Sequence, residues 1–364
     1  EKANLMERLF SSVQMALART KGSLFVAVLF VSVIFGAATG IVGASVTILG
    51  IMSAKTMNRA GYDVQLAAGT ITAGGTLGIL IPPSIMLVVM GPILNVPVTD
   101  LFAAAIMPGL MLAVLYTAYT LIRCHLNPSL GPVVPEDLIP DSMREVWIEF
   151  FKGLVPPVLL VGSSLGSILG GLATPTEGAA MGAVGAIFLT LAYRKLNFKV
   201  FQEALLKTLE ITTLIMILVC ASNFFGSVFS RLGTPTMITE ALMVLDLPPT
   251  VILLIVMALI FLLAWPLEWV PIVLIIIPIV LPLIEQLGFN LTWFGILVAV
   301  NLQTAWLSPP VALSAYFLKG VAPEWDLADI YKGMMQFMAI QVVGLALIII
   351  FPQIVLWLPT YLYG

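Results

Sequence analysis

Long apolar stretches separated by short polar connectors run along nearly the whole chain. They cover residues 23–52, 64–93, 101–122, 153–171, 176–193, 208–229, 236–245, 250–266, 269–287, 291–307, 310–318 and 334–360. A helix needs about 20 apolar residues to cross a bilayer, and several stretches reach that length. Of the 364 residues, 60% are hydrophobic and only 10% are charged, whereas soluble domains have about a quarter charged. The pattern predicts an all-α polytopic membrane protein.

The opening segment, residues 1–22, differs from the rest. It mixes apolar residues with the basic side chains of Arg8, Arg19 and Lys21, and it lacks the pattern of a signal peptide. We expect an amphipathic helix at the cytoplasmic face of the membrane. Because the first residue is not Met, we also expect the chain to begin inside a longer protein.

The basic residues predict how the chain crosses the membrane. Segments 23–52 and 250–287 are each interrupted near the middle, and we interpret both as re-entrant hairpins that leave on the side they entered. Of the 16 basic residues, only Arg231 then falls on the face opposite the others. The positive-inside rule makes the basic face cytoplasmic. Two full spans would instead scatter the basic residues over both faces.

Two segments resemble each other at a spacing of 227 residues: Gly61 to Ser84 and Gly288 to Pro310. Each contains a Pro-Pro pair inside an apolar stretch and follows one of the predicted hairpins. The first copy has Lys55 and Arg59 at its entrance, whereas the second has Glu285 at its entrance and Lys319 at its exit. The copies therefore run in opposite directions, as inverted repeats of secondary carriers do.

The Pro-Pro pairs are predicted to break both helices. Proline lacks a backbone donor, so Pro82-Pro83 and Pro309-Pro310 should free the carbonyls of Gly78, Ile79, Ala305 and Trp306. Broken backbone at membrane depth must be buried in protein or line a polar cavity. Freed carbonyls suit Na⁺, and the half-helices that start near Ser84 and Val311 direct positive ends toward an anion. Two proline kinks that only shape packing are the alternative.

Three motifs, in order along the chain, carry a family resemblance. They are Gly75-Thr76-Leu77-Gly78-Ile79-Leu80-Ile81-Pro82-Pro83-Ser84, then Thr174-Pro175-Thr176-Glu177-Gly178-Ala179-Ala180, and finally Asn301-Leu302-Gln303-Thr304 with Ser308-Pro309-Pro310 and Lys319-Gly320-Val321-Ala322-Pro323. Together they span most of the chain and resemble the large membrane subunit of the tripartite ATP-independent periplasmic (TRAP) transporters.

The resemblance implies an elevator-type carrier of the ion transporter superfamily, in the bacterial inner membrane. Its transport domain of two hairpins and two broken helices would slide against a scaffold, driven by Na⁺. The implied partners are a small four-helix membrane subunit (Q-type), a periplasmic substrate-binding protein (P-type) and a small organic anion, a carboxylate. The family's leading scaffold helices are expected to be missing from this chain.

The resemblance also implies a division of the chain. We expect an amphipathic helix over 1–22, a first transport repeat over 23–93 (hairpin 23–52, broken helix 64–93) and scaffold helices over 101–230. A second repeat should cover 236–320 (hairpin 250–287, broken helix 291–318), and a C-terminal scaffold helix should cover 324–364.

Cation sites are predicted where each hairpin tip meets a broken helix, because hydroxyl and carbonyl oxygens suit a hard cation. The candidate ligands are Thr39, Gly40, Gly75, Thr76 and Gly78 for the first Na⁺, and Ala264, Trp265, Gln303, Thr304 and Ala305 for the second. Substrate is expected between the tips, near Ser84, Asn301, Ser308 and Glu268, beside the helix-breaking Pro82, Pro83, Pro309 and Pro310.

The chain departs from the family at several of these positions. Thr39-Gly40-Ile41 stands where Ser-Gly-Ser is usual, so one hydroxyl is missing, and Ala264 and Ala305 stand where glycine is common. We therefore expect the cation sites to rely more on backbone carbonyls. Glu177 follows Pro175 at a helix start, where capping by Thr174 or Thr176 is favoured over a role in transport. His125, the single histidine, is expected at the surface.

Other classes of protein fit less well. A single-component elevator symporter without a binding protein stays open, and co-purification of a small membrane subunit would separate it from the TRAP prediction. A membrane metalloprotease needs paired histidines with a glutamate, which one histidine cannot supply, so no enzyme is expected. The chain has no phosphate-binding loop for ATP. Neither an organic cofactor nor a nucleic-acid partner is expected, and the substrate's identity cannot be read from these residues.

Overall fold

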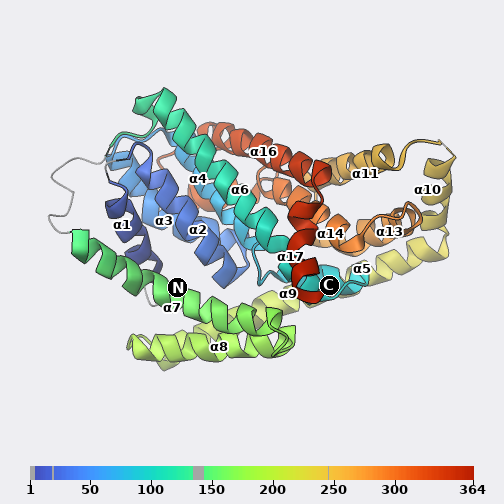
Figure 1. Cartoon of the computed structure of the whole chain (residues 1–364), viewed down its shortest axis with the longest axis horizontal. Helices are drawn as coiled ribbons and strands as arrows, with labels where there is room; N and C mark the ends of the chain where they lie inside the picture. Colours follow the sequence, from blue (N-terminus) through green and yellow to red (C-terminus); the bar gives the residue numbers. More distant parts are fainter. Residues whose placement is uncertain (1–4, 19, 134–142, 245) are drawn as a thin grey trace.

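The computed structural model describes residues 5–18, 20–133, 143–244 and 246–364, and every regular element in these ranges is helical. Figure 1 shows an elongated bundle with α7 and α8 along one edge and α10 at one end. The helices are α1 (Leu5–Ala16), α2 (Ser23–Thr39), α3 (Val42–Arg59), α4 (Val64–Thr76), η1 (Leu77–Ile79), α5 (Ile85–Leu94), α6 (Val98–Leu126), η2 (Pro128–Leu130), α7 (Met143–Leu169), α8 (Pro175–Ala192), α9 (Phe198–Arg231), α10 (Thr234–Met243), α11 (Pro249–Ala264), α12 (Trp269–Pro271), η4 (Ile272–Ile276), α13 (Ile277–Gln286), α14 (Leu291–Leu302), η5 (Gln303–Trp306), α15 (Leu313–Val321), α16 (Leu327–Ile350) and α17 (Gln353–Tyr363). The all-α prediction is confirmed.

Hairpin 1 consists of α2 and α3, which pack against each other. The α2 helix ends because Gly40 adopts left-handed backbone (φ 62°) and donates its N–H to the Gly36 carbonyl, a conformation that costs glycine little. The turn lies at the predicted break, Thr39-Gly40. The second arm continues to Arg59 instead of ending at residue 52, because its buried face extends through Ala54 and Met57.

The first broken helix follows as α4, η1 and α5. Asp63 begins it by accepting a hydrogen bond from the Leu66 N–H at 2.8 Å, as an N-cap does. Regular helix stops at Ile79 and resumes at Ile85, because Pro82 and Pro83 between them have no N–H to donate. The predicted break is therefore present.

The second repeat has the same order of elements. Hairpin 2 is formed by α11 and by a second arm of α12, η4 and α13; α14, η5 and α15 form the second broken helix. Asn290 caps α14 by accepting from the Trp293 N–H at 3.0 Å, as Asp63 caps α4. The α15 half-helix begins at Leu313 and not at Val311, since Ala312 has a positive φ of 28°.

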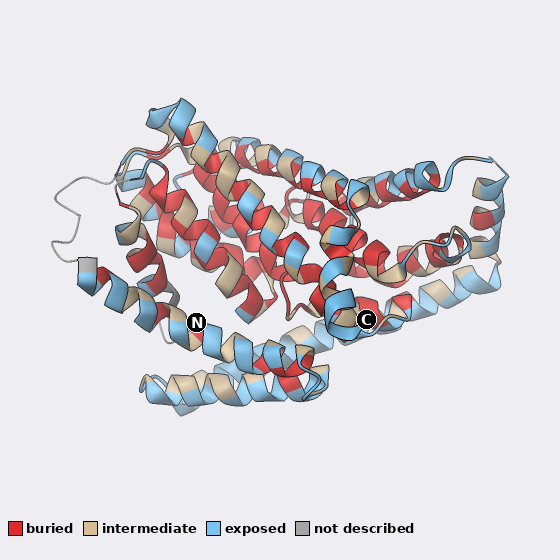
Figure 2. Ribbon diagram, in the orientation of Figure 1, coloured by how far each residue is buried: buried red, intermediate tan, exposed pale blue. Residues whose placement is uncertain are grey.

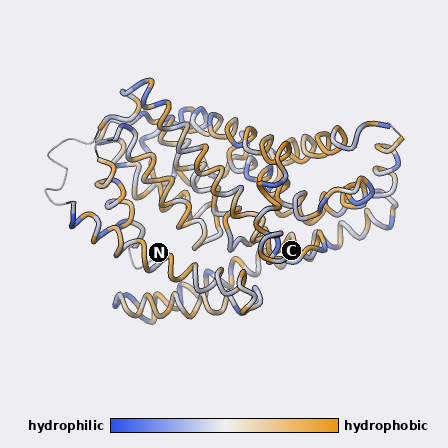
Figure 3. The backbone as a smooth tube through the Cα atoms, viewed as in Figure 1, coloured by the Kyte–Doolittle hydropathy of each residue, from blue (hydrophilic) through white to orange (hydrophobic). Residues whose placement is uncertain are grey.

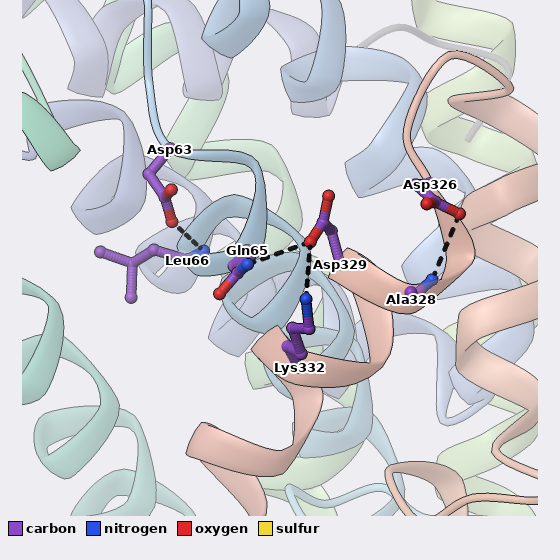
Figure 4. Close-up of polar contacts among 7 residues, drawn as sticks. All are labelled: Asp63, Gln65, Leu66, Asp326, Ala328, Asp329 and Lys332. Atoms are coloured by element: carbon purple, nitrogen blue, oxygen red, sulfur yellow. Dashed lines mark hydrogen bonds and ion pairs between the residues drawn. The ribbon is translucent and has the colours of Figure 1, made fainter.

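Contacts at both ends show that the two copies run in opposite directions. Asn58 donates to Glu324 at 2.9 Å and Gln65 donates to Asp329 at 3.0 Å. The entrance of the first copy therefore lies beside the exit of the second, and Figure 4 shows Asp329 held by both Gln65 and Lys332. At the other end α5 packs against α14, so the exit of the first copy lies beside the entrance of the second.

Two long helices, α6 and α16, pack along the broken helices. The α4 and α16 backbones touch, because a Cβ added at Gly333 would lie 1.9 Å from the Gln65 carbonyl oxygen. The α6 helix contacts α4, α5 and α14. We expected both helices in the scaffold, and in the structure both pack against the crossovers. Figure 2 shows the buried residues concentrated in this central part of the bundle.

Helices α7, α8 and α9 lie at the periphery and expose apolar side chains. Leu209, Leu214 and Phe224 on α9 are 62%, 58% and 75% exposed, and Figure 3 shows hydrophobic residues on outer as well as central helices. Among the described residues, six helices are long and apolar enough to cross a membrane: Val98–Leu126, Arg144–Leu169, Pro175–Ala192, Phe198–Arg231, Trp269–Gln286 and Leu327–Ile350. Apolar outer surfaces of this kind suit contact with lipid.

The two ends of the chain differ in how well they match expectation. The α1 helix is amphipathic as predicted, and it buries Leu9, Phe10 and Val13 where it packs against α7 and α2. The single C-terminal helix expected over 324–364 is instead two helices, α16 and α17, separated at Phe351-Pro352. Residue 352 is a proline, which disfavours helical backbone at the residue before it.

The arrangement makes a testable prediction about sidedness. In a chain whose native Cys124 and Cys220 are replaced, cysteines placed near Lys55, Arg123, Lys195 and Lys332 should react with an impermeant maleimide only from the cytoplasm. Cysteines near Asn95 and Asp246 should react only from the periplasm. Labelling near Lys55 from the periplasm would show that residues 23–52 form a full span and would contradict the inverted topology.

Candidate cation and substrate site

The tip of hairpin 1 lies directly against the first break. A Cβ added at Gly36 would lie 2.8 Å from Gly78 Cα, and one at Gly40 would lie 3.2 Å from the Pro83 carbonyl oxygen. Backbone atoms cannot move aside as the end of a side chain does. Glycine is therefore required where the hairpin and the crossover touch main chain to main chain.

Two hydroxyls lie in the same region. Thr39 Oγ1 and Ser45 Oγ are 3.0 Å apart. A Cβ added at Gly78 would lie 3.4 Å from Ser45 Oγ. The sequence prediction missed Ser45 because it considered only the tip motif, Thr39 to Ile41. Ser45 lies in the first turn of α3, where its N–H donates to the Ile41 carbonyl at 3.1 Å. It brings a hydroxyl to the tip of hairpin 1, where Ile41 has none.

Gly75 and Thr76 meet different neighbours. A Cβ at Gly75 would lie 2.4 Å from Val46 Cγ2 on α3, so Gly75 faces hairpin 1. Thr76 is fully buried, and its hydroxyl donates to the Ala73 carbonyl at 2.8 Å. The Tyr116 hydroxyl on α6 lies close to Thr76. Thr76 Oγ1, whose own proton is bound to Ala73, can accept a contact from Tyr116 or from a ligand.

Serine hydroxyls donate hydrogen bonds to two of the four carbonyls predicted to be free. Ser84 Oγ donates to the Ile79 carbonyl, and Ser314 Oγ donates to the Trp306 carbonyl. The prediction is wrong for these two carbonyls, because a side chain supplies the donor that proline lacks.

The other two carbonyls, those of Gly78 and Ala305, remain candidates. Each is followed four residues later by a proline without an N–H, Pro82 or Pro309. The Ile81 N–H, the other backbone donor within reach of Gly78, is bonded to the Leu77 carbonyl. The Gly78 carbonyl oxygen is thus left for a ligand.

The hydroxyls of the second crossover donate within the backbone. Thr304 Oγ1 donates to the Asn301 carbonyl at 2.6 Å, and Ser308 Oγ donates to the Thr304 carbonyl at 2.7 Å. Each oxygen keeps lone pairs that suit a cation, but neither has a proton left for an anion. This geometry favours Thr304 as a cation ligand. It does not favour Ser308, nor Ser84 with the same bonding, as a donor to an anionic substrate.

Buried amides surround the same crossover. Asn301 is fully buried, and its Nδ2 donates to the Met257 carbonyl of hairpin 2 at 2.8 Å. Gln303 Oε1 accepts from Gln341 Nε2 of α16 at 2.6 Å. Asn301 Oδ1, Gln303 Nε2 and Gln341 Oε1 have no hydrogen-bond partner. Unpartnered buried polar atoms are costly, so these atoms are suited to holding something polar.

The tip of hairpin 2 is more open than that of hairpin 1. Ala264 is buried at the end of α11, whereas Glu268 is exposed. Trp265 Nε1 is buried without a partner, and α11 contacts both α14 and η5. The tip is followed by a π-helical turn, Ile272–Ile276, which the apolar sequence pattern could not reveal and which is frequent at functional sites.

A cavity of about 450 Å³ lies beside the tip of hairpin 1. It is lined by Ala37 and Ala38 of α2, by Pro83 and Ser84 of the first break, and by residues of α7 and α8. Asn301, Ser308 and Glu268 do not line it. Of the four predicted substrate residues, only Ser84 lines this cavity.

Glu177 and His125, two titratable residues considered in the sequence analysis, have the surroundings expected for them. Glu177 and Thr174 form a capping box: the carboxylate accepts from the Thr174 N–H at 2.8 Å, and the Glu177 N–H donates to Thr174 Oγ1 at 3.3 Å. The capping role that the sequence favoured is the one seen. His125 is exposed at the end of α6.

The fold and the site define a class of protein. Two hairpins and two helices broken inside an apolar bundle, running in opposite directions, are the architecture of a membrane transport protein. The atoms gathered at the breaks are neutral oxygens and amides, not paired acids and bases or a nucleophile with its base.

Comparisons with known proteins agree. A family model described as "Tripartite ATP-independent periplasmic transporter, DctM component" matches residues 1–354. The sialic acid TRAP transporter large permease protein SiaM of Vibrio cholerae is 27% identical over 363 residues, covering 100% of this chain and 83% of that protein. The C4-dicarboxylate TRAP transporter large permease protein DctM of Pseudomonas aeruginosa is 29% identical over 358 residues, covering 98% and 82%.

A solved structure shares the fold. The YdaH transporter of Alcanivorax borkumensis matches with a TM-score of 0.67 at 18% identity, over 96% of this chain and 84% of that one. This chain belongs to the DctM family, the large permeases of TRAP transporters. It is a multi-pass protein of the bacterial inner membrane whose role is transport and not catalysis.

Proposed function

We propose that this chain is the transport subunit of a Na⁺-coupled importer of small organic anions, which works by an elevator movement. The observation that carries the proposal is the gathering of neutral oxygens at both helix breaks. At the first break these are the Thr39 and Ser45 hydroxyls beside Gly78. At the second break they include Asn301 Oδ1, which is buried without a partner.

The kind of ligand supports Na⁺ as the coupling ion. Hard cations prefer oxygen ligands, and a monovalent ion can be held by neutral oxygens. Within the described ranges, no group of three or more His, Cys, Asp or Glu side chains is placed to hold a metal ion. The residues at the two breaks therefore fit a monovalent hard cation better than a transition metal, which takes nitrogen and sulfur ligands.

The packing supports a movement of the hairpins and crossovers as one body. Glycine contacts join α4 to α16 and α2 to η1, main chain against main chain. Cavities of about 450 and 300 Å³ instead lie between this body and α7. A closely packed interface resists sliding, whereas a loosely packed one permits it. We propose that α6 and α16 move with the hairpins, and that α7, α8 and α9 belong to the scaffold.

The cargo and partners are proposed from the relatives. Two relatives are named for sialic acid and C4-dicarboxylates, which are both carboxylates, and the family description is tripartite and periplasmic. We propose a carboxylate cargo that a periplasmic binding protein delivers. A small membrane subunit completes the complex and would cover part of the exposed apolar surface of the peripheral helices.

Coupling can be tested in proteoliposomes that contain this chain, its small subunit and the binding protein. With radiolabelled sialic acid and C4-dicarboxylates as probes, we expect uptake that needs an inward Na⁺ gradient and rises sigmoidally with Na⁺. Uptake supported equally by K⁺, or by a proton gradient alone, would contradict Na⁺ coupling. Equal uptake after omission of the binding protein and small subunit would identify the single-component symporter instead.

A further inference from the structure

A buried amide on α16 faces the second helix break. Gln341 is fully buried, and its Nε2 donates to Gln303 Oε1 at 2.6 Å and to the Val300 carbonyl at 3.1 Å. Its Oε1 atom has no partner. The side chain thus makes two hydrogen bonds to the crossover and keeps one buried acceptor unused.

Packing alone does not explain this residue. A buried amide that leaves its acceptor unpaired costs free energy relative to an apolar side chain of the same size. Asn301 Oδ1, on the same short stretch, is also buried and unpartnered. Two buried acceptors without a donor at one helix break indicate a ligand that takes their lone pairs, as a cation does. Gln303 Nε2 is unpartnered too, but it is a donor and does not ligate a cation.

We propose that Gln341 is a further residue of the second cation site: it positions the Gln303 side chain and directs its own Oε1 toward the ion. This inference rests on the proposed Na⁺ coupling. An amide oxygen is a good neutral ligand for a hard cation. Since Gln341 lies on α16, ion binding would also tie α16 to the crossover, so the helix and the ion would move together.

The test is cation-dependent thermal unfolding of the purified complex in nanodiscs, in Na⁺, Li⁺ or K⁺ at constant ionic strength made up with choline. An ion that binds the folded protein raises the unfolding temperature, and the rise grows with the concentration of the ion. We expect Gln341→Met, which keeps the length but loses the amide, to raise the half-saturating Na⁺ concentration about tenfold, the size expected for one charge-assisted contact.

Two further variants separate the site from general packing. Gln336 lies on the same helix and bonds Tyr119 and Arg123 of α6 at 2.7 and 3.2 Å, away from the break. Gln336→Met should therefore leave the half-saturating Na⁺ concentration within about twofold of the parent. The double variant Gln303→Met/Gln341→Met removes both partners of the hydrogen bond and should shift Na⁺ dependence less than the sum of the single shifts.

The outcomes distinguish this inference from the proposed function. If the parent protein responds to Na⁺ and Gln341→Met responds at the same concentration, Gln341 is a packing residue and the inference is wrong. If Li⁺ or K⁺ stabilises the parent but Na⁺ does not, the Na⁺ assignment is wrong. The half-saturating concentration of the stabilising ion in Gln341→Met then decides whether Gln341 is a ligand. If no cation stabilises the parent, both proposals are wrong.

Discussion

Gly36→Ala is expected to cause a large loss of Na⁺-dependent uptake in the reconstituted complex. The added methyl would lie 2.8 Å from Gly78 Cα and 3.0 Å from Gly78 N. Neither atom can give way unless hairpin 1 separates from η1, and separation would move the Thr39 and Ser45 hydroxyls away from Gly78. Overpacking of this kind costs about 1–3 kcal/mol, so we expect the cation site to weaken about tenfold or more.

A matched control exists on α9. A Cβ at Gly226 would meet nothing closer than the Leu274 carbonyl oxygen at 3.9 Å, an ordinary contact, so Gly226→Ala should leave uptake unchanged. Assembly with the small subunit should be measured for both variants by co-purification. Normal Na⁺ dependence in assembled Gly36→Ala would show that close contact between hairpin and crossover is unimportant for coupling.

Thr304→Val is expected to raise the Na⁺ concentration needed for half-maximal uptake about tenfold, the effect of losing one contact to a charged ligand. Valine keeps the shape of threonine but removes Oγ1, whose proton is already bound to the Asn301 carbonyl. Only its lone pairs are free for a cation. Thr76→Val, at the first break, should act in the same direction because the Thr76 hydroxyl is bonded likewise to Ala73.

Thr190 supplies the control for both changes. Its hydroxyl donates to the Ala186 carbonyl at 2.7 Å on α8, so Thr190→Val removes a comparable intrahelical bond on a helix that supplies none of the candidate cation ligands. Na⁺ dependence should then match that of the parent. If Thr76→Val and Thr304→Val both transport normally at low Na⁺, the two hydroxyls serve packing and are not ligands.

The elements at the centre of the fold were predictable because their causes are local. Gly40 ends α2, the Pro-Pro pairs interrupt both long helices, and Asp63 and Asn290 cap the helices that follow each hairpin. Each feature depends on the backbone chemistry of one or a few neighbouring residues. The opposite direction of the repeats was also predictable, because the charges flanking each copy follow the sidedness of the membrane.

The partners of these elements were not predictable from the chain. The bond from Gln341 to Gln303 spans 38 residues, and the apolar sequence around Gln341 shows only a helix. Ser45 meets Gly78 because two glycine-containing segments approach main chain to main chain, a distance that no periodicity encodes. The packing of α6 and α16 against the crossovers could not be predicted from the sequence, because a helix buried in protein and one facing lipid are both apolar.

By itself the sequence determined the membrane class, the helix breaks and the inverted order, since bilayer thickness, proline and charge act on short segments. Only the tertiary structure decided which oxygens are already hydrogen-bonded and which are free to bind a ligand. Ser84 and Ser314 occupy the Ile79 and Trp306 carbonyls, whereas Asn301 Oδ1 has no partner. Every hydroxyl and amide has several possible partners within a bilayer, and packing between distant segments selects among them.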